Sequence, residues 1–143
     1  EKVGELEGRP VFSDYGHHPA AITGTLEATS EFFPGKKVLL VFQPHHRSRT
    51  KSLFGEFVAS LAKVDHVIIP EIFEVTGREH EEDIDISSKD LVAELVKEKI
   101  SAEYAPNLET AGKMICDQIN NFDLAILMGA GDIDNLARKL VSK

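Results

Sequence analysis

Three short, continuous apolar runs constrain the fold of this chain most strongly. They are "KVLLVF" (Lys37 to Phe42), "DHVIIP" (Asp65 to Pro70) and "DLAILM" (Asp123 to Met128). Runs of this length without polar alternation are typical of parallel strands whose two faces are both covered by helices. Between them, apolar residues recur at helical spacing. The alternation predicts an α/β architecture with right-handed crossover connections.

Weaker signals extend the expected sheet at its edges. "RPVFSDY" is expected to be extended, and "EKVGELEG" before it would pair with it in antiparallel fashion through a turn at Glu7 and Gly8. "SAEYA" predicts one more short strand. The expected fold is a Rossmann-like three-layer α/β sandwich. Its sheet would be mostly parallel, with about six strands and one antiparallel edge strand.

Capping residues mark the helices that are expected between these strands. Ser87, followed by Asp90 three residues later, predicts a capping box. Asn107 is expected to cap the next helix. A long acidic stretch, Glu71 to Ile86, is expected to be a mobile surface loop. The five expected helices have their apolar positions within residues 22–33, 53–61, 91–96, 108–119 and 133–140.

Composition excludes several classes of protein. At 143 residues, the chain has the size of one ordinary domain, and residues 1–143 are expected to form it. We expect no membrane association, because no transmembrane segment or signal peptide is recognisable. The net charge of −8 makes nucleic acid an unsuitable partner, since phosphate neutralisation needs clustered Lys and Arg.

Two further features bear on the compartment and the length of the protein. Cys116 is the single cysteine, which excludes an internal disulfide and favours a reducing, cytoplasmic compartment. Its place in an apolar helical pattern predicts a buried thiol. Because Glu1 lies inside an expected strand, we expect the chain to be part of a longer protein.

Two histidine-rich segments follow the first two parallel strands. They are "DYGHHP" (Asp14 to Pro19) and "QPHHRSR" (Gln43 to Arg49). The carboxyl ends of parallel strands meet at one edge, where open α/β sheets bind ligands. Four of the six histidines are therefore expected at that edge. A plain turn is the alternative for the first segment, since Pro19 suits the first helical position and His18 the cap.

The second segment also carries two arginines. Arg47 and Arg49 are expected at the N-terminal end of a helix, where a cation opposes the helix dipole. Stability does not explain that placement, whereas recognition of a carboxylate or phosphate does. No metal site is predicted, because adjacent histidines cannot easily direct both rings at one ion. The acidic run around His80 lacks the spaced ligands of a calcium loop.

A third segment, "MGAGDIDN" (Met128 to Asn135), places Gly-x-Gly between a strand and a helix. The third glycine of a dinucleotide fingerprint is missing, because Asp134 stands in its place. Asp132 is expected to cap the helix, so the turn itself accounts for the motif. No Walker A motif is present, and the chain alone is not expected to hold ATP.

Taken together, "DYGHHP", then "FQPH..SRT", then "GAGDI" resemble the C-terminal domain of the Mur ligases, in order and over nearly the whole chain. The most similar branch joins L-alanine to UDP-N-acetylmuramate through an acyl phosphate, in bacterial peptidoglycan precursor synthesis. The resemblance implies ATP and Mg²⁺ as cofactors of the full-length enzyme. It also implies that UDP-N-acetylmuramate, L-alanine and ATP are shared with two preceding domains, and that this chain is inactive alone.

The same resemblance implies roles for residues at the strand ends. Tyr15 and His17 would face the muramoyl and alanine region, and Arg49 would hold the amino-acid carboxylate. Many family members carry an arginine where this chain has His46, so whether Arg47 makes that contact stays open. The expected substrate-binding set is Tyr15, His17, His45, Arg47 and Arg49, and the expected nucleotide-side and closure set is Asp14, Gly129 and Asp132.

An alternative of another class fits the same residues. It is a free-standing, non-catalytic Rossmann-like module that binds an anionic metabolite. Neither reading predicts the oligomeric state.

Overall fold

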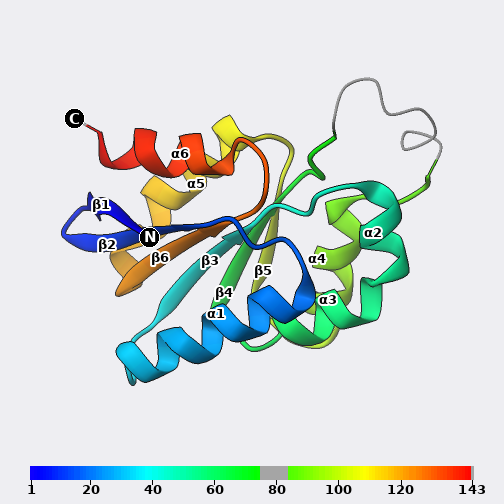
Figure 1. Ribbon diagram of the computed structural model, residues 1–143, viewed down its shortest axis with the longest axis horizontal. Coiled ribbons are helices and arrows are strands. Elements are labelled where there is room, and N and C mark those ends of the chain that lie inside the picture. The colour runs from blue at the N-terminus through cyan, green and yellow to red at the C-terminus, as the bar shows by residue number, and fades with distance from the viewer. Residues whose placement is uncertain (75–83, 143) are drawn as a thin grey trace.

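The computed structural model describes residues 1–74 and 84–142 (Figure 1). Strands and helices alternate along these residues as the apolar pattern predicts. The strands are β1 (Lys2–Leu6), β2 (Arg9–Asp14), β3 (Val38–Phe42), β4 (His66–Pro70), β5 (Ala102–Ala105) and β6 (Leu124–Met128). The helices are α1 (Pro19–Phe32), α2 (Arg47–Ser52), α3 (Phe54–Leu61), α4 (Ser88–Lys97), α5 (Leu108–Gln118), the 3₁₀ turn η1 (Ile119–Asn121) and α6 (Ile133–Val141).

The six strands form one sheet in the order β1-β2-β6-β3-β4-β5. β1 pairs with β2 in antiparallel fashion, and the other neighbouring pairs are parallel. Glu7 and Gly8, both with positive φ, make the turn between β1 and β2. The expected fold class, with one antiparallel edge strand, is confirmed.

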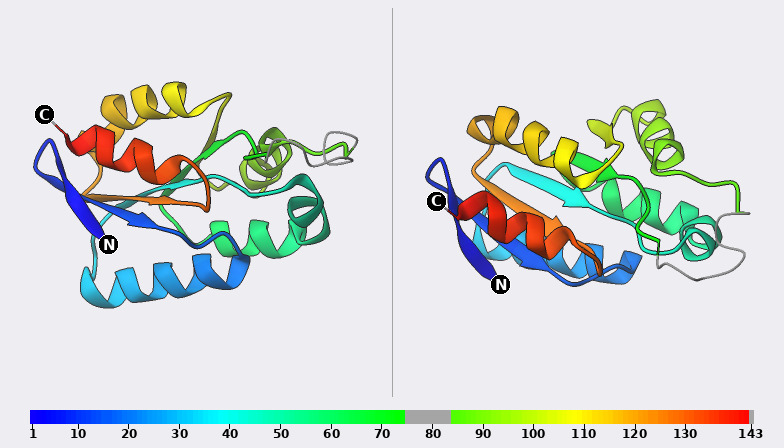
Figure 2. Two further views of the ribbon diagram at one scale, coloured as in Figure 1. Left: turned by 45° about the horizontal axis from the view of Figure 1, so that its top comes forward. Right: turned by 90° about the horizontal axis from the view of Figure 1, so that it is seen from above.

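The three apolar runs form the strands β6, β3 and β4 in the middle of the sheet, where both faces are covered. Every residue of β3, β4 and β6 is buried. Side chains of one face join a core with α1, α3 and α4, and those of the other face join a core with α5 and α6. Figure 2 shows the sheet between these two helical layers.

The strand order places a switch point at β6, which lies between β2 and β3. The segments that follow β2 and β3 lead to helices on one face of the sheet, while α6 after β6 covers the other face. Ligands of open α/β sheets bind outside the carboxyl ends of the strands at such a point. The topology therefore predicts a binding site at the carboxyl ends of β2, β3 and β6.

The predicted helix caps are largely confirmed. His18 precedes α1, and its Nδ1 accepts a hydrogen bond from the Ala20 N–H at 3.2 Å. Ser87 and Asp90 form the complete capping box of α4. Asn107 caps α5 by accepting a hydrogen bond from the Thr110 N–H at 2.7 Å.

Three expectations about helices were wrong. The second helix is two short helices, α2 and α3, which meet at Leu53. Cys116 is exposed, because it lies one position beyond the buried Ile115 on the solvent side of α5. Asp132 stands at the N-cap of α6 but makes no capping hydrogen bond through its side chain.

The acidic loop expected from Glu71 to Ile86 has its centre, including His80, outside the described residues. In the part of the chain that is described, no helix has the length and apolar character needed to cross a membrane.

Candidate functional site

Three of the residues expected to bind substrate meet at the carboxyl edge of the sheet. The His17 and His45 rings make an edge-to-face contact with centroids 5.5 Å apart. The Tyr15 ring lies 6.2 Å from the His17 ring, also edge to face, and is 71% exposed. The turn after β2 and the loop after β3 thus form one aromatic surface that solvent can reach.

Phe73, which the sequence did not single out, belongs to the same surface. Its ring stacks on the His45 ring with centroids 5.2 Å apart and planes 20° from parallel. The main chains are joined as well, since Phe73 N–H donates to the Pro44 carbonyl and His46 N–H to the Phe73 carbonyl. The sequence shows only an apolar pair, Ile72 and Phe73, soon after the buried strand, which does not single out Phe73.

The glycines of "GAGD" are required by close packing. A Cβ at Gly131 would lie 2.7 Å from atoms of the Phe73 ring, and one at Gly129 would lie 3.1 Å from the Gln43 carbonyl oxygen. The Gly129 N–H donates to the Asp14 carbonyl at 3.0 Å. The loop after β6 is therefore packed against the ends of β2 and β3 and against the Phe73 ring.

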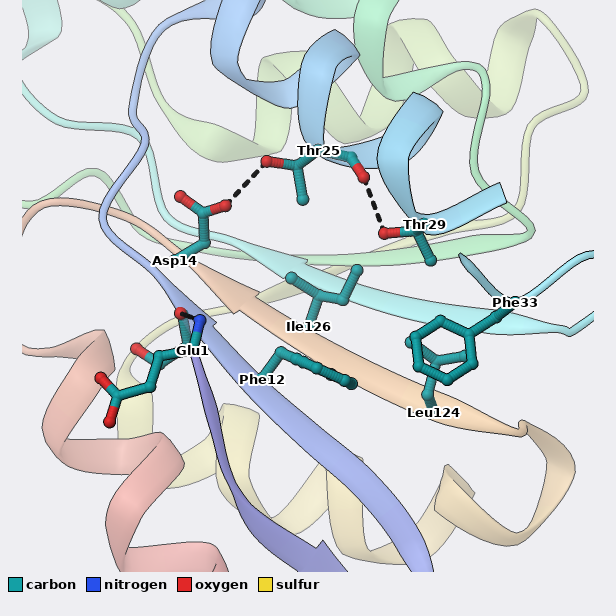
Figure 3. A pocket seen from close by; sticks show the side chains of 9 residues that line it. Glu1, Phe12, Asp14, Thr25, Thr29, Phe33, Leu124 and Ile126 are labelled. Carbon is teal, nitrogen blue, oxygen red and sulfur yellow. Dashed lines mark hydrogen bonds between the residues drawn. The ribbon is translucent and has the colours of Figure 1, made fainter. Parts of the chain in front are cut away.

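Asp14 organises the turn after β2. Its Oδ1 accepts a hydrogen bond from the Gly16 N–H at 2.8 Å, and its Oδ2 accepts one from the Thr25 hydroxyl at 2.7 Å. Figure 3 shows this carboxylate beside a cavity of about 90 Å³ between the sheet and α1. Both oxygens of Asp14 thus fix the segment that carries Tyr15 and His17.

His46 precedes α2 with a backbone that L-residues rarely adopt, at φ 70° and ψ 131°. Its carbonyl accepts hydrogen bonds from the N–H and the hydroxyl of Thr50. Its ring centroid lies 3.9 Å from that of His45. Unusual backbone of this kind persists only where the surroundings impose it, and it is often found at functional sites.

Arg47 is engaged in contacts within the chain. Its Nε donates to the Glu74 carboxylate, and its Nη1 donates to the Ile86 carbonyl. Its guanidinium therefore joins the loop after β3 to the residues on both sides of the undescribed segment.

Arg49 differs from Arg47 in its surroundings. Its Nη1 is buried and has no hydrogen-bond partner within residues 1–74 and 84–142. Arg49 is the third residue of α2, which has only six residues, so it lies in the first turn and in the last turn of this helix. The dipole of so short a helix does not account for Arg49. Its buried donor has no partner among the described residues, whereas buried polar groups normally have one.

Glu71, which directly follows β4, joins the start of α4 to β5. Burial alone would raise its pKa, but hydrogen bonds from the Ile72 and Ser88 N–H groups and from the Ser87 and Tyr104 hydroxyls together lower it. Burial and the bond to Glu71 raise the pKa of Tyr104, which keeps that phenol a donor.

Asp132 is not part of this group. It lines a separate open hollow between α5 and α6, together with Cys116. Its neighbour Asp134 accepts hydrogen bonds from Arg138 and Ser13, which lower the pKa of Asp134 and tie α6 to β2. Asp134 lies in the first turn of α6, and its carboxylate accepts both of these hydrogen bonds there.

Among the described residues there is neither a cluster of metal ligands nor an open phosphate loop at Gly131. Within them, no three His, Cys, Asp or Glu side chains gather in a way that could hold a metal ion. The space beside Gly131, where a nucleotide phosphate would approach the backbone of a dinucleotide loop, is occupied by the Phe73 ring.

Comparison with known proteins finds a family that matches most of this chain. The family model of the Mur ligase, glutamate ligase domain, matches residues 1–131. The UDP-N-acetylmuramate–L-alanine ligase of Alkaliphilus metalliredigens is 40% identical over 141 residues, which are 99% of this chain and 30% of that protein. The enzyme of the same name from Lachnoclostridium phytofermentans is 39% identical over 143 residues, 100% of this chain and again 30% of the relative.

A solved structure shows the same fold. The crystal structure of the UDP-N-acetylmuramate–alanine ligase of Thermotoga maritima superposes with a TM-score of 0.70 at 25% sequence identity. The match covers 94% of this chain and 26% of that one. The chain thus spans about 30% of the length of the curated relatives that it matches.

Proposed function

Because the chain belongs to the Mur ligase family, through its glutamate ligase domain, we propose that residues 1–143 form the C-terminal domain of a longer ATP-dependent ligase. That ligase joins L-alanine to UDP-N-acetylmuramate in the bacterial cytoplasm. Curated relatives of that name, 34–40% identical over nearly the whole chain, support the substrate assignment.

The observation that carries the amino-acid part of this proposal is the state of Arg49. The Arg47 guanidinium donates hydrogen bonds to Glu74 and to the Ile86 carbonyl. The buried Nη1 of Arg49, by contrast, has no hydrogen-bond partner among the described residues. A guanidinium matches a carboxylate with two parallel hydrogen bonds. Arg49 is therefore the proposed ligand of the alanine carboxylate, and Arg47 the residue that holds the adjoining loops in place.

The other site residues orient and enclose the substrate in this proposal. Tyr15 and His17 form the exposed wall that faces the muramoyl and alanine region, and His45 supports His17 from behind. An imidazole can donate or accept a hydrogen bond near neutral pH, which suits a wall that contacts a polar substrate. Asp14 fixes the position of these two wall residues, because its carboxylate accepts hydrogen bonds from the Gly16 N–H and the Thr25 hydroxyl.

ATP and Mg²⁺ belong to the full-length enzyme in this proposal. No group of His, Cys, Asp or Glu side chains among the described residues could hold the metal ion, and no step is assigned to a residue of this chain through either group. What Asp14, Gly129 and Asp132 contribute to closure over the nucleotide stays a proposal taken from the family resemblance.

The test is Arg49→Ala in the full-length ligase. The Michaelis constant for L-alanine is expected to rise about tenfold or more, the scale of a lost charge-assisted hydrogen bond. Lys51→Ala, an exposed cation in the same turn of α2, is the matched control and should leave that constant unchanged. A raised constant for ATP with an unchanged one for L-alanine would move Arg49 to the nucleotide side.

A further inference from the structure

The Phe73 ring connects loops that follow four different strands. It stacks on His45 from the loop after β3, and His45 in turn contacts His17 from the turn after β2. Phe73 itself follows β4, and its ring fills the space above Gly131 in the loop after β6. Three segments that are distant in sequence thus contribute a ring each to one cluster, and the fourth contributes Gly131, on which the Phe73 ring packs.

We propose that Phe73 is a positioning residue for the amino-acid end of the site. It acts by holding the His45 ring, and through it the His17 ring, at a fixed angle. This inference rests on the proposed function, because it assigns the wall formed by His17 and Tyr15 to the substrate. It gives a role to a residue that neither the motifs nor the comparisons single out.

The main chain reinforces the ring contact. Phe73 N–H donates to the Pro44 carbonyl at 2.8 Å, and His46 N–H donates to the Phe73 carbonyl at 3.2 Å. These two hydrogen bonds align the backbones of His45 and Phe73 side by side. The backbones of the two stacked residues are therefore fixed relative to each other, and the Phe73 ring covers one face of the His45 ring.

Gly131 makes the arrangement specific. A Cβ at this position would lie 2.7 Å from two atoms of the Phe73 ring, closer than side chains pack. The second glycine of "GAGD" thus leaves the space that the Phe73 ring occupies. Any side chain there must displace Phe73, and with it the surface on which His45 rests.

The experiment compares Phe73→Leu with Phe73→Tyr in the full-length ligase. Phe73→Leu removes the flat ring, and the Michaelis constant for L-alanine is expected to rise about fivefold, with kcat changed less than twofold. Phe73→Tyr keeps the ring and should restore the wild-type constant. Phe54→Leu, the same substitution at the first residue of α3, where the ring packs against the core and not against His45, is the control.

A spectroscopic measurement separates positioning from general loss of structure. In histidine-labelled enzyme, the ring signals of His45 should shift in Phe73→Leu, because the ring current of the stacked phenyl group is lost, and should stay in place in Phe54→Leu. Gly131→Ala provides a second route to the same displacement and should raise the L-alanine constant in the same direction.

Two results would overturn the inference. One is an L-alanine constant in Phe73→Leu equal to that of Phe54→Leu, and the other is a Phe73→Tyr variant as impaired as Phe73→Leu. Failure of the proposed function has a different signature, since the Arg49→Ala variant would then leave the L-alanine constant unchanged. In that case shifted His45 signals in Phe73→Leu would still support the positioning of His45 by Phe73.

Discussion

Arg47 and Arg49 stand two residues apart on one short helix and have different surroundings. The Arg47 guanidinium bonds to Glu74 and to the Ile86 carbonyl, while the Nη1 of Arg49 is buried with no bond to any residue that the structure describes. A buried guanidinium N–H without a partner costs more than a typical hydrogen bond contributes. At the residue scale, a ligand for Arg49 would stabilise the chain as well as bind to it.

Glu71 provides a prediction at the same scale. Its lowered pKa means that the ionised carboxylate stabilises the folded chain at neutral pH. Glu71→Gln should lower the free energy of unfolding by about 1 kcal/mol at neutral pH, after allowance for solvent screening. The difference from wild type should shrink as the pH falls from the ordinary value of 4.5 through the lower folded-state pKa. Urea denaturation at several pH values measures it.

Glu109→Gln is the control for this experiment. Glu109 is exposed on α5 and pairs with Lys113, which is also exposed, at 3.6 Å. Its removal should change the free energy of unfolding by less than about 0.5 kcal/mol at any pH. A difference between Glu71→Gln and wild type that grows toward acidic pH would contradict the assignment of a lowered pKa to Glu71.

At the scale of elements, the adjacent histidines His17 and His18 before α1 have different roles. His18 caps the helix through Nδ1, and Pro19 occupies the first helical position. His17 instead contacts Tyr15 and His45. One histidine of the pair therefore belongs to the helix entrance and the other to the aromatic wall.

The capping role of His18 can be measured. His18→Ala should lower the free energy of unfolding by about 1 kcal/mol, because the Ala20 N–H loses its acceptor. His18→Asn, which offers an oxygen to the same N–H, should recover most of that loss. His17→Ala is the matched comparison one residue earlier, and a larger loss from it than from His18→Ala would contradict this division of work.

The elements could be predicted well where one physical factor dominates. Val38 to Phe42 is buried on both faces, so its apolar run alone marks the strand, and the Ser87 and Asp90 pair marks a helix start by itself. The break at Leu53 has a weaker signal, since Gly55 stands two residues later inside α3 and no proline is present there. Phe73 could not be predicted as a site residue, because its role depends on three loops that only the folded sheet brings together.

At the scale of the whole molecule, the division of labour within the ligase is testable. This chain alone should show no ATP-dependent formation of UDP-N-acetylmuramoyl-L-alanine, because no group of His, Cys, Asp or Glu side chains among its described residues could hold the metal ion. Product detection with purified chain and all three substrates measures this. The full-length ligase under the same conditions is the positive control, and turnover by the 143-residue chain would refute the division.

The place of β6 has a consequence for how the chain is made. The last strand of the sequence lies between β2 and β3, and it pairs with both of them. While the ribosome is still adding residues, β1 with β2 and β3 with β4 and β5 can form only two separate half-sheets. Long-range strand pairing of this kind is slow and leaves strand edges open in the meantime. The newborn protein therefore joins its two halves, and assembles the edge that carries the site, only after residue 128 has left the ribosome.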